Sequence, residues 1–216
     1  MPGTPDATAL MYVHMSLGSI PEDEFSRWYD KHAPARLAMP GVLTARRYWS
    51  ASPHGPRHLA MYDLAELSAL ESPDYLAMRA DERPRDREFM GRLTLMDRRV
   101  YRALDVGEPW AKASARSTRF LISMTMDIPV PQIPDYHAWY LEEHIPMLLE
   151  VPGWRRIRRF QQVCEGHSFL ALHDVDSLDV FETPEFKAAV GTPWRDRVLG
   201  YASRRERLVF ELAQAY

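Results

Sequence analysis

The hydrophobic and polar positions of the chain follow one order that begins with a strand and a helix. Residues 10–17 form an apolar run of β-favouring side chains. Shortly after it, Phe25, Trp28 and Tyr29 fall at positions i, i+3 and i+4, the spacing of a single helix face. The same spacing returns later in the chain at Tyr136, behind a second apolar run. The pattern therefore predicts two strand-then-helix starts.

Further alternating segments predict the remaining strands. Pro-Gly pairs at 40–41 and 152–153 break the chain before each second strand. Ser72-Pro73 and Thr183-Pro184, each followed by an acidic residue, are typical of a helix start. The predicted strands after the first are 42–49, 58–64 and 99–104 in one half and 154–163, 168–175 and 208–212 in the other. The predicted order is βαββαβ, written twice.

The two halves are also similar in sequence. Trp28-Tyr29 with His32 and Pro34 recurs as Trp139-Tyr140 with His144 and Pro146, and the spacing is one residue longer in the second copy. Self-similarity at a fixed offset indicates a duplicated unit. We expect a first repeat over 9–104, a linker over 105–118 and a second repeat over 119–213.

The order βαββαβ is the ferredoxin-like pattern, an antiparallel sheet with both helices on one face. Each sheet then has one bare face, and two bare sheets in one chain should bury each other. The predicted fold class is therefore α+β, with two ferredoxin-like repeats packed sheet to sheet as an intrachain α/β barrel.

Alternation along the first strands sorts their side chains into two sets. Polar sets occur in both copies, and apolar, methionine-rich sets alternate with them. We expect the methionine-rich faces to lie under the helices and the polar faces to line the barrel. The polar sets are Tyr12, His14 and Ser16 in the first copy and Ser123, Thr125 and Asp127 in the second.

Composition narrows the classes of function. A net charge of −3 with mixed signs gives no broad basic field, so a nucleic acid is not an expected partner. No apolar run is long enough to span a membrane, and we expect a cytoplasmic protein. A single cysteine, Cys164, excludes an intrachain disulfide and a thiolate-rich metal site. Metal-ligand spacings and nucleotide-binding loops are absent, so we expect neither a metal nor a cofactor.

The string Trp-Tyr-x-Glu-Glu-His-x-Pro followed by Pro-Gly, over 139–153, resembles the EthD-like branch of the dimeric α/β-barrel superfamily. The first repeat departs from it, because Lys31 stands where a glutamate is usual. The resemblance covers both halves and implies the fold. It leaves the reaction open, since the superfamily includes cofactor-free cyclases and isomerases, quinone-forming monooxygenases and haem enzymes.

Three residues are the first candidates for catalysis. His14 can take and give a proton near neutral pH, or it is a structural histidine held by hydrogen bonds. His173 has the same two interpretations. We expect Tyr62 to line the barrel with Tyr12 and His14, and His173 to line it with Ser123 and Thr125. Tyr62, which occupies the place equivalent to His173, could donate a hydrogen bond to a developing enolate oxygen, or simply satisfy its hydroxyl in the core.

The repeated motif supplies a second group of candidates. His32 and His144 stand just before an x-Pro step, where the helix should kink or end, and either fix that kink or lie at the mouth of a cavity. Trp28 and Trp139 are core residues or platforms for a substrate. Arg46 and Arg158, at equivalent strand positions, hold an acidic ligand group or serve solubility.

Together these observations favour an enzyme that binds a small, largely apolar, aromatic or polyketide-like carbonyl compound as its small-molecule substrate. We expect a cofactor-independent lyase, isomerase or cyclase acting by proton transfer. The alternatives are a haem-binding or oxygen-using enzyme, with His144 as a candidate axial ligand, and a non-catalytic ligand-binding barrel. A homodimer is also considered.

Overall fold

The computed structural model describes residues 6–52, 54, 56–81, 84–106, 110, 118–164 and 167–216. The chain divides into two compact units. Unit 1 comprises Met1–Val106 together with Leu212–Tyr216, and unit 2 comprises Gly107–Glu211. Most of the predicted linker, 105–118, lies outside the described residues, so that boundary stays a prediction.

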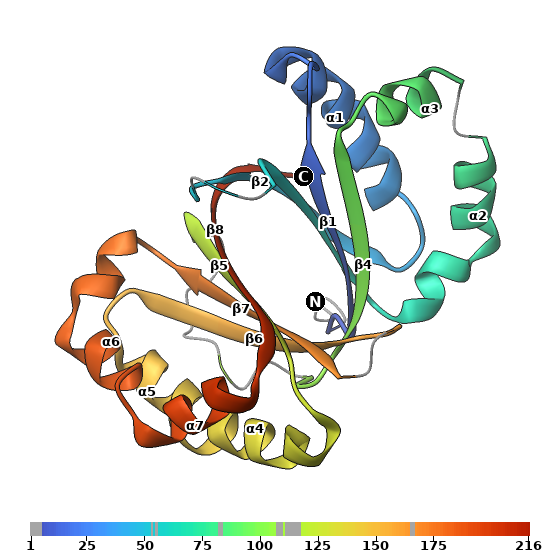
Figure 1. Cartoon of the computed structure of the whole chain (residues 1–216). Helices are drawn as coiled ribbons and strands as arrows, with labels where there is room; N and C mark the ends of the chain where they lie inside the picture. The colour runs from blue at the N-terminus through green and yellow to red at the C-terminus, as the bar shows by residue number, and fades with distance from the viewer. Residues whose placement is uncertain are drawn as a thin grey trace, which may run out of the picture. The chain divides into compact units, whose positions relative to one another are not determined.

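Unit 1 contains four strands with helices between them. Figure 1 shows its helices on one side of its sheet. In chain order the elements are β1 (Ala9–Ser16), α1 (Glu22–Leu37), β2 (Val42–Ser50), β3 (His58–Leu64), the 3-10 turn η1 (Leu67–Glu71), α2 (Pro73–Ala80), α3 (Pro84–Gly91) and β4 (Leu95–Ala103).

Unit 2 repeats this order, and its first helix is interrupted by a π-helical turn. In chain order the elements are β5 (Phe120–Asp127), the 3-10 turn η2 (Val130–Gln132), α4 (Ile133–Trp139), the π-turn η3 (Tyr140–His144), α5 (Ile145–Glu150), β6 (Trp154–Gln162), β7 (Ser168–Val175), the 3-10 turn η4 (Leu178–Glu182), α6 (Pro184–Ala189), α7 (Pro193–Tyr201) and β8 (Ser203–Ala215).

Both sheets have the strand order of a ferredoxin-like unit. In unit 1 the antiparallel neighbours run β2-β3-β1-β4, and in unit 2 they run β6-β7-β5-β8. The predicted fold class, α+β with two ferredoxin-like repeats, is confirmed.

The duplication extends to backbone irregularities. Pairing between β2 and β3 shifts register after Val42, and pairing between β6 and β7 shifts at the equivalent Trp154. Just before each shift a glycine has positive φ, +82° at Gly41 and +87° at Gly153. The carbonyl of each glycine accepts a hydrogen bond from the backbone N–H of the residue that directly follows the third strand of its unit. The Pro-Gly breakers thus start both second strands in the same way.

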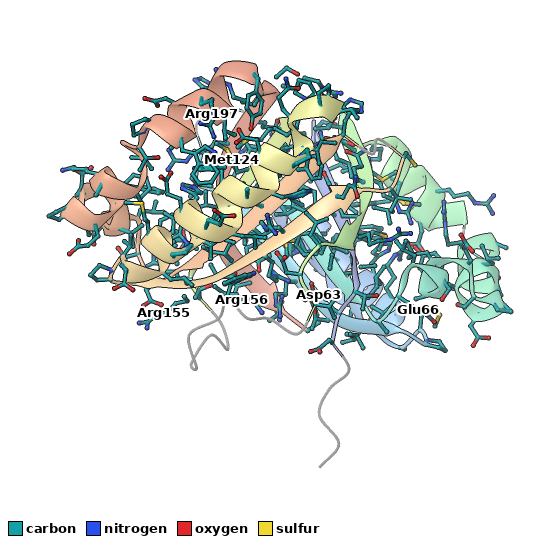
Figure 2. All side chains as sticks on the ribbon, turned by 90° about the horizontal axis from the view of Figure 1, so that it is seen from below. Asp63, Glu66, Met124, Arg155, Arg156 and Arg197 are labelled. Atoms are coloured by element: carbon teal, nitrogen blue, oxygen red, sulfur yellow. The ribbon has the colours of Figure 1, made fainter. Side chains whose placement is uncertain are left out.

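The methionine-rich faces lie under the helices, as predicted. In unit 1, Met11 and Met15 share one core with Phe25 and Tyr29 from α1. In unit 2, Met124, labelled in Figure 2, borders a pocket together with residues of the covering helices. The sheet face that carries His14 is therefore the one turned away from the helices of its own unit.

Two local expectations need correction. α1 runs through Pro34 to Leu37 instead of ending near His32, because a proline inside a helix removes one hydrogen bond without always breaking the rest. The fourth strands are longer than predicted, and α3 and α7 were not foreseen. Among the described residues, no helix combines the length and apolar character that crossing a membrane requires.

We predict that Gly41→Ala lowers the free energy of unfolding by about 1–3 kcal/mol, because the new side chain would hold a strained positive φ. A Cβ at this position would also lie 2.7 Å from the Cβ of Ala69. Gly153→Ala should cost less, since its nearest neighbour is the Val180 Cγ1 atom at 3.3 Å. Urea unfolding measures both.

The matched control is Gly200→Ala in α7. No heavy atom lies within 4 Å of a Cβ built there. Alanine is the better helix former, so this variant should be as stable as the wild type or up to about 1 kcal/mol more stable. A loss of stability at Gly200 equal to that at Gly41 would contradict the role assigned to the positive φ.

Candidate functional site

The candidate site is a pocket inside unit 2, between the sheet and its covering helices. It has a cavity volume of about 90 Å³ and is partly open to solvent. One water molecule requires only about 10–15 Å³ of such space, so the cavity has room for a group larger than water. Its walls are mostly apolar and aromatic. The residues that line it are Ile122, Met124, Met126, Trp139, Tyr140, His144, Leu148, Trp154, His173, Phe181, Phe186, Val190, Arg195, Leu199 and Arg207.

Strand alternation places one histidine in this pocket. Ile122, Met124 and Met126 occupy the helix-facing positions of β5. His173 of β7 pairs with Ile122 in the antiparallel register, and paired residues project to the same face. His173 therefore lies under the helices, beside the indole of Trp154 at a ring-centroid distance of 5.4 Å.

The π-turn places the second histidine. The N–H of Ile145 donates to the carbonyl of Tyr140, a bond that spans five residues. In a regular α-helix residue i+4 lies over residue i, whereas the wider π-turn brings i+5 to that place. His144 accordingly stacks on Trp139, with 4.3 Å between the ring centroids. In unit 1 the rings of His32 and Trp28 lie 4.1 Å apart in the same way, although the sequence separation between them is one residue shorter.

Four buried nitrogen atoms around the pocket have no hydrogen-bond partner within the described part of the chain. They are the indole Nε1 atoms of Trp139 and Trp154 and the imidazole Nδ1 atoms of His144 and His173. His144 also forms a hydrogen bond with the backbone of Ala189. Buried polar atoms are nearly always hydrogen-bonded, to protein, water or ligand. This grouping is what a site made for a polar ligand group would show.

Burial keeps both imidazoles neutral. The pKa of His144 is lowered to about 3, chiefly by loss of hydration and further by His173 and Arg195. The pKa of His173 is lowered to about 4, again chiefly by burial, with Asp174 opposing the shift and Arg207 adding to it. At neutral pH each ring therefore has a free lone pair available for a proton.

The pocket is bordered by positive charge. Arg195 from α7 and Arg207 from β8 both line it, and its lining contains no aspartate or glutamate. The pKa of Arg207 is lowered by burial and by the nearby Arg195. In the described residues no group of three or more histidine, cysteine, aspartate or glutamate side chains could hold a metal ion.

The equivalent place in unit 1 is filled by protein. Phe89 stacks on Trp28 at 4.7 Å, and the Trp28 Nε1 atom donates to Asp86 at 3.0 Å. Arg36 lies 2.9 Å from the Nδ1 atom of His32, and the pKa of His32 is lowered to about 2 by burial and by Arg36. The same motif is thus closed in the first repeat and open in the second.

Tyr62 and His173 do share one orientation, but it is toward the helices and not toward the polar faces of β1 and β5. Tyr62 pairs with Met11, and its hydroxyl lies 2.9 Å from the hydroxyl of Tyr29 in α1. Grouping Tyr62 with Tyr12 and His14 was therefore wrong, as was grouping His173 with Ser123 and Thr125. In the observed register Tyr62 and His173 pair with Met11 and Ile122, which lie on the helix-facing sides of β1 and β5.

His14 lies apart from the unit 2 pocket, on the other face of the unit 1 sheet. Its Nε2 atom is 2.9 Å from the Tyr12 hydroxyl, and it pairs across strands with Asp97. Its pKa is lowered to about 4 by burial first and then by Arg99. Ser16 lies on the same face, at the end of β1. The catalytic role predicted for His14 stays a prediction.

The remaining candidates lie on sheet faces away from the pocket. Arg46 forms an ion pair with Asp63 at 3.0 Å, and Arg158 approaches Asp174 at 4.0 Å. Asp127 lies 3.4 Å from the guanidinium of Arg204. Ser123 and Thr125 are buried on the face opposite Met124. Arg46 is thus paired with an intramolecular carboxylate, and Arg158 lies near one, so a role in holding a ligand stays a prediction for both.

Trp154, Arg195 and Arg207 are among the lining residues that were not predicted from the sequence. A signal existed for Arg195, because Thr192-Pro193 repeats the cap-and-proline start seen at Thr183-Pro184. The Thr192 hydroxyl accepts a hydrogen bond from the Arg195 N–H at 3.2 Å. Trp154 follows the Pro-Gly breaker directly. Nothing local distinguished Arg207 from the other arginines of β8.

Comparison with solved structures agrees with this architecture. A chlorite dismutase variant from Candidatus Nitrospira defluvii is similar with a TM-score of 0.66 and 10% identity, over 98% of this chain and 93% of that one. An anthrone oxidase-like protein gives a TM-score of 0.63 and 14% identity, with coverages of 98% and 93%.

A ferredoxin-fold protein from Listeria monocytogenes, related to antibiotic biosynthesis monooxygenases, gives a TM-score of 0.54 and 10% identity over 96% of each chain. At these identities the likeness shows a shared fold alone. No family profile matches the sequence, and no curated protein matches it.

We predict that stability falls as the pH drops from 7.5 to 5, in part through His173. The unfolded imidazole takes up a proton near pH 6.5, whereas the folded one does so only near its lowered pKa of about 4. Stability is therefore fully present above pH 6.5 and declines as the pH falls toward 4. For His173 the loss at pH 5 is about 2 kcal/mol.

Urea unfolding of His173→Gln at both pH values tests this expectation. The variant should lose about 2 kcal/mol less than the wild type between pH 7.5 and 5. The control is His167→Gln, because His167 is exposed. An identical pH dependence in His173→Gln and the wild type would show that His173 is not held neutral by the fold.

Proposed function

We propose that the unit 2 pocket binds a small, largely apolar carbonyl compound and that its histidines transfer a proton without a cofactor, as in a lyase, isomerase or cyclase. The observation that carries this proposal is the pair of tryptophan–histidine contacts, Trp139 with His144 and Trp154 with His173, around one cavity. In each contact, the indole nitrogen and one imidazole nitrogen have no hydrogen-bond partner among the described residues.

His144 is suited to accept the proton. Its hydrogen bond to the backbone of Ala189 fixes the ring, and its Nδ1 atom has no partner among the described residues. A neutral imidazole with a fixed tautomer can remove a proton from the carbon beside a carbonyl group. The electron pair of that C–H bond then moves into the carbonyl, which becomes an enolate.

The donors around the pocket are suited to the developing negative charge. Indole N–H groups can only donate, and guanidinium groups donate and carry charge. Preorganised donors of this kind stabilise an enolate oxygen more than the ground-state carbonyl. The negative charge of the enolate in turn stabilises the protonated form of His144. This attraction offsets the effect of burial, which lowers the pKa of that imidazole. Return of the proton to a different carbon completes an isomerisation, and His173 is the second group able to deliver it.

A haem enzyme is the second candidate. An imidazole that bonds a backbone group with one nitrogen and leaves the other open is the usual form of a metal-ligating histidine. His144 fits that description, and the apolar walls with Arg195 and Arg207 suit a flat ligand that carries carboxylates. The names of the similar structures, an oxidase-like protein and a chlorite dismutase, support this candidate. Bound haem would supply oxygen chemistry there.

Two further parts of the hypothesis stay open to test. Membership of the EthD-like branch rests on the motif at 139–153, and a homodimer rests on the fold alone. The filled pocket of unit 1 supports a division of labour in which the first repeat is structural and the second binds the ligand. A non-catalytic binding protein would have the same pocket but would bind the ligand without converting it.

We predict that the protein accelerates hydrogen–deuterium exchange beside the carbonyl of 2-tetralone, a bicyclic aromatic ketone, measured by NMR in D₂O. His144→Gln retains a donor for Ala189 but removes the base, so the rate should fall by roughly 10²- to 10⁴-fold with the melting temperature little changed. His32→Gln, the equivalent change in unit 1, is the matched control and should retain the rate.

His14→Ala is the competing variant. A loss of exchange in His14→Ala with full activity in His144→Gln would move the working site to unit 1. Titration with haemin tests the second candidate. A Soret band that depends on His144, in a protein without exchange activity, would replace the proton-transfer proposal by the haem proposal.

A further inference from the structure

Arg195 and Arg207 give the unit 2 pocket a charge that the proton transfer alone does not require. They come from different elements, α7 and β8, and meet at the same cavity. The side chain of Arg195 donates to the Val190 carbonyl at 2.9 Å, which holds the guanidinium in place. The Arg207 guanidinium lies over the Phe181 ring at 4.3 Å from its centroid. Both positive groups are therefore fixed by neighbours that do not neutralise them.

Among the described residues, carboxylates pair only weakly with these two arginines. The nearest ion pair of Arg195 is with Asp196 at 3.9 Å, and the Asp196 side chain is 75% exposed. Within the described residues Arg207 has no carboxylate at ion-pair distance. Elsewhere in unit 2 arginines are closely paired, such as Arg156 with Asp174 at 2.7 Å and Arg197 with Asp135 at 2.6 Å.

Two guanidinium groups at one cavity repel each other, although solvent around the exposed Arg207 screens part of the repulsion. The pocket lining supplies no aspartate or glutamate to relieve it. The two imidazoles cannot relieve it either, because protonation would add charge of the same sign. An anionic ligand group is the component that would make this arrangement favourable.

We propose that the substrate of this pocket is an aromatic carboxylate that also bears a carbonyl group, with its carboxylate held by Arg195 and Arg207 and its rings packed against Met124 and the tryptophans. This inference rests on the proposed function, because it concerns the same cavity, and it names the substrate class. Guanidinium groups bind carboxylates through paired, charge-assisted hydrogen bonds. The carboxylate also orients the carbonyl toward the histidines.

The test compares two ligands of one shape, 2-naphthoate and 2-naphthamide. Quenching of tryptophan fluorescence reports their binding, since Trp139 and Trp154 line the pocket. The wild type should bind the acid at least about 10-fold more tightly than the amide, in line with the strength of hydrogen bonds to charged groups. Arg207→Gln should bring the two affinities together by weakening the acid alone.

Matched variants keep the test decisive. Arg205→Gln makes the same change of charge in β8 at a residue that is exposed like Arg207 but does not line the pocket, and it should retain the preference for the acid. Arg195→Gln gives an independent variant on another element. Arg207→Lys keeps the charge but loses the planar fork, and it should retain only part of the preference.

Several results would overturn the inference. Equal binding of acid and amide to the wild type would do so while leaving the proposed function intact, provided that 2-tetralone exchange still depends on His144. Equal weakening by Arg205→Gln and Arg207→Gln would indicate surface binding. A Soret band with haemin that depends on Arg207, without any preference between the naphthyl ligands, would assign the arginines to haem carboxylates.

Discussion

Helices cover one face of each sheet, so every strand places alternate side chains under those helices. This constraint decides what each residue of the sheets can do. It places Met124 and His173 in the interior of unit 2, between sheet and helices. It places His14 and Tyr12 on the other face of unit 1. Side chains two residues apart can cooperate, whereas adjacent ones cannot. The chemistry of the pocket follows from which positions share a face.

The duplicated units show how little sequence change separates a filled interior from an open one. In unit 1, Asp86 accepts from the Trp28 indole and Arg36 meets His32, so the polar atoms of the motif are satisfied within the protein. In unit 2 the corresponding atoms of Trp139 and His144 have no partner among the described residues. A π-turn lengthened by one residue preserves the tryptophan–histidine stack while the surroundings change.

The fold could be predicted from the sequence because its signals occur in both repeats and agree with one another. These signals are strand alternation, Pro-Gly breakers and capped helix starts. His144, His173 and Trp139 were also among the predicted residues. The side on which Tyr62 and His173 lie was predicted wrongly, since alternation within a strand does not give its register against a neighbour. Arg207 could not be predicted, because its role depends on α7 bringing Arg195 to the same cavity.

The course of β8 bears on how the protein is made. The strand begins in unit 2, yet residues from Leu212 onward group with unit 1, where the Tyr216 N–H bonds the Ala45 carbonyl and its hydroxyl bonds Asp30. During translation the ribosome releases unit 1 without this last segment and must synthesise all of unit 2 before supplying it. Most of unit 1 is therefore synthesised first, yet unit 1 is the last to be completed.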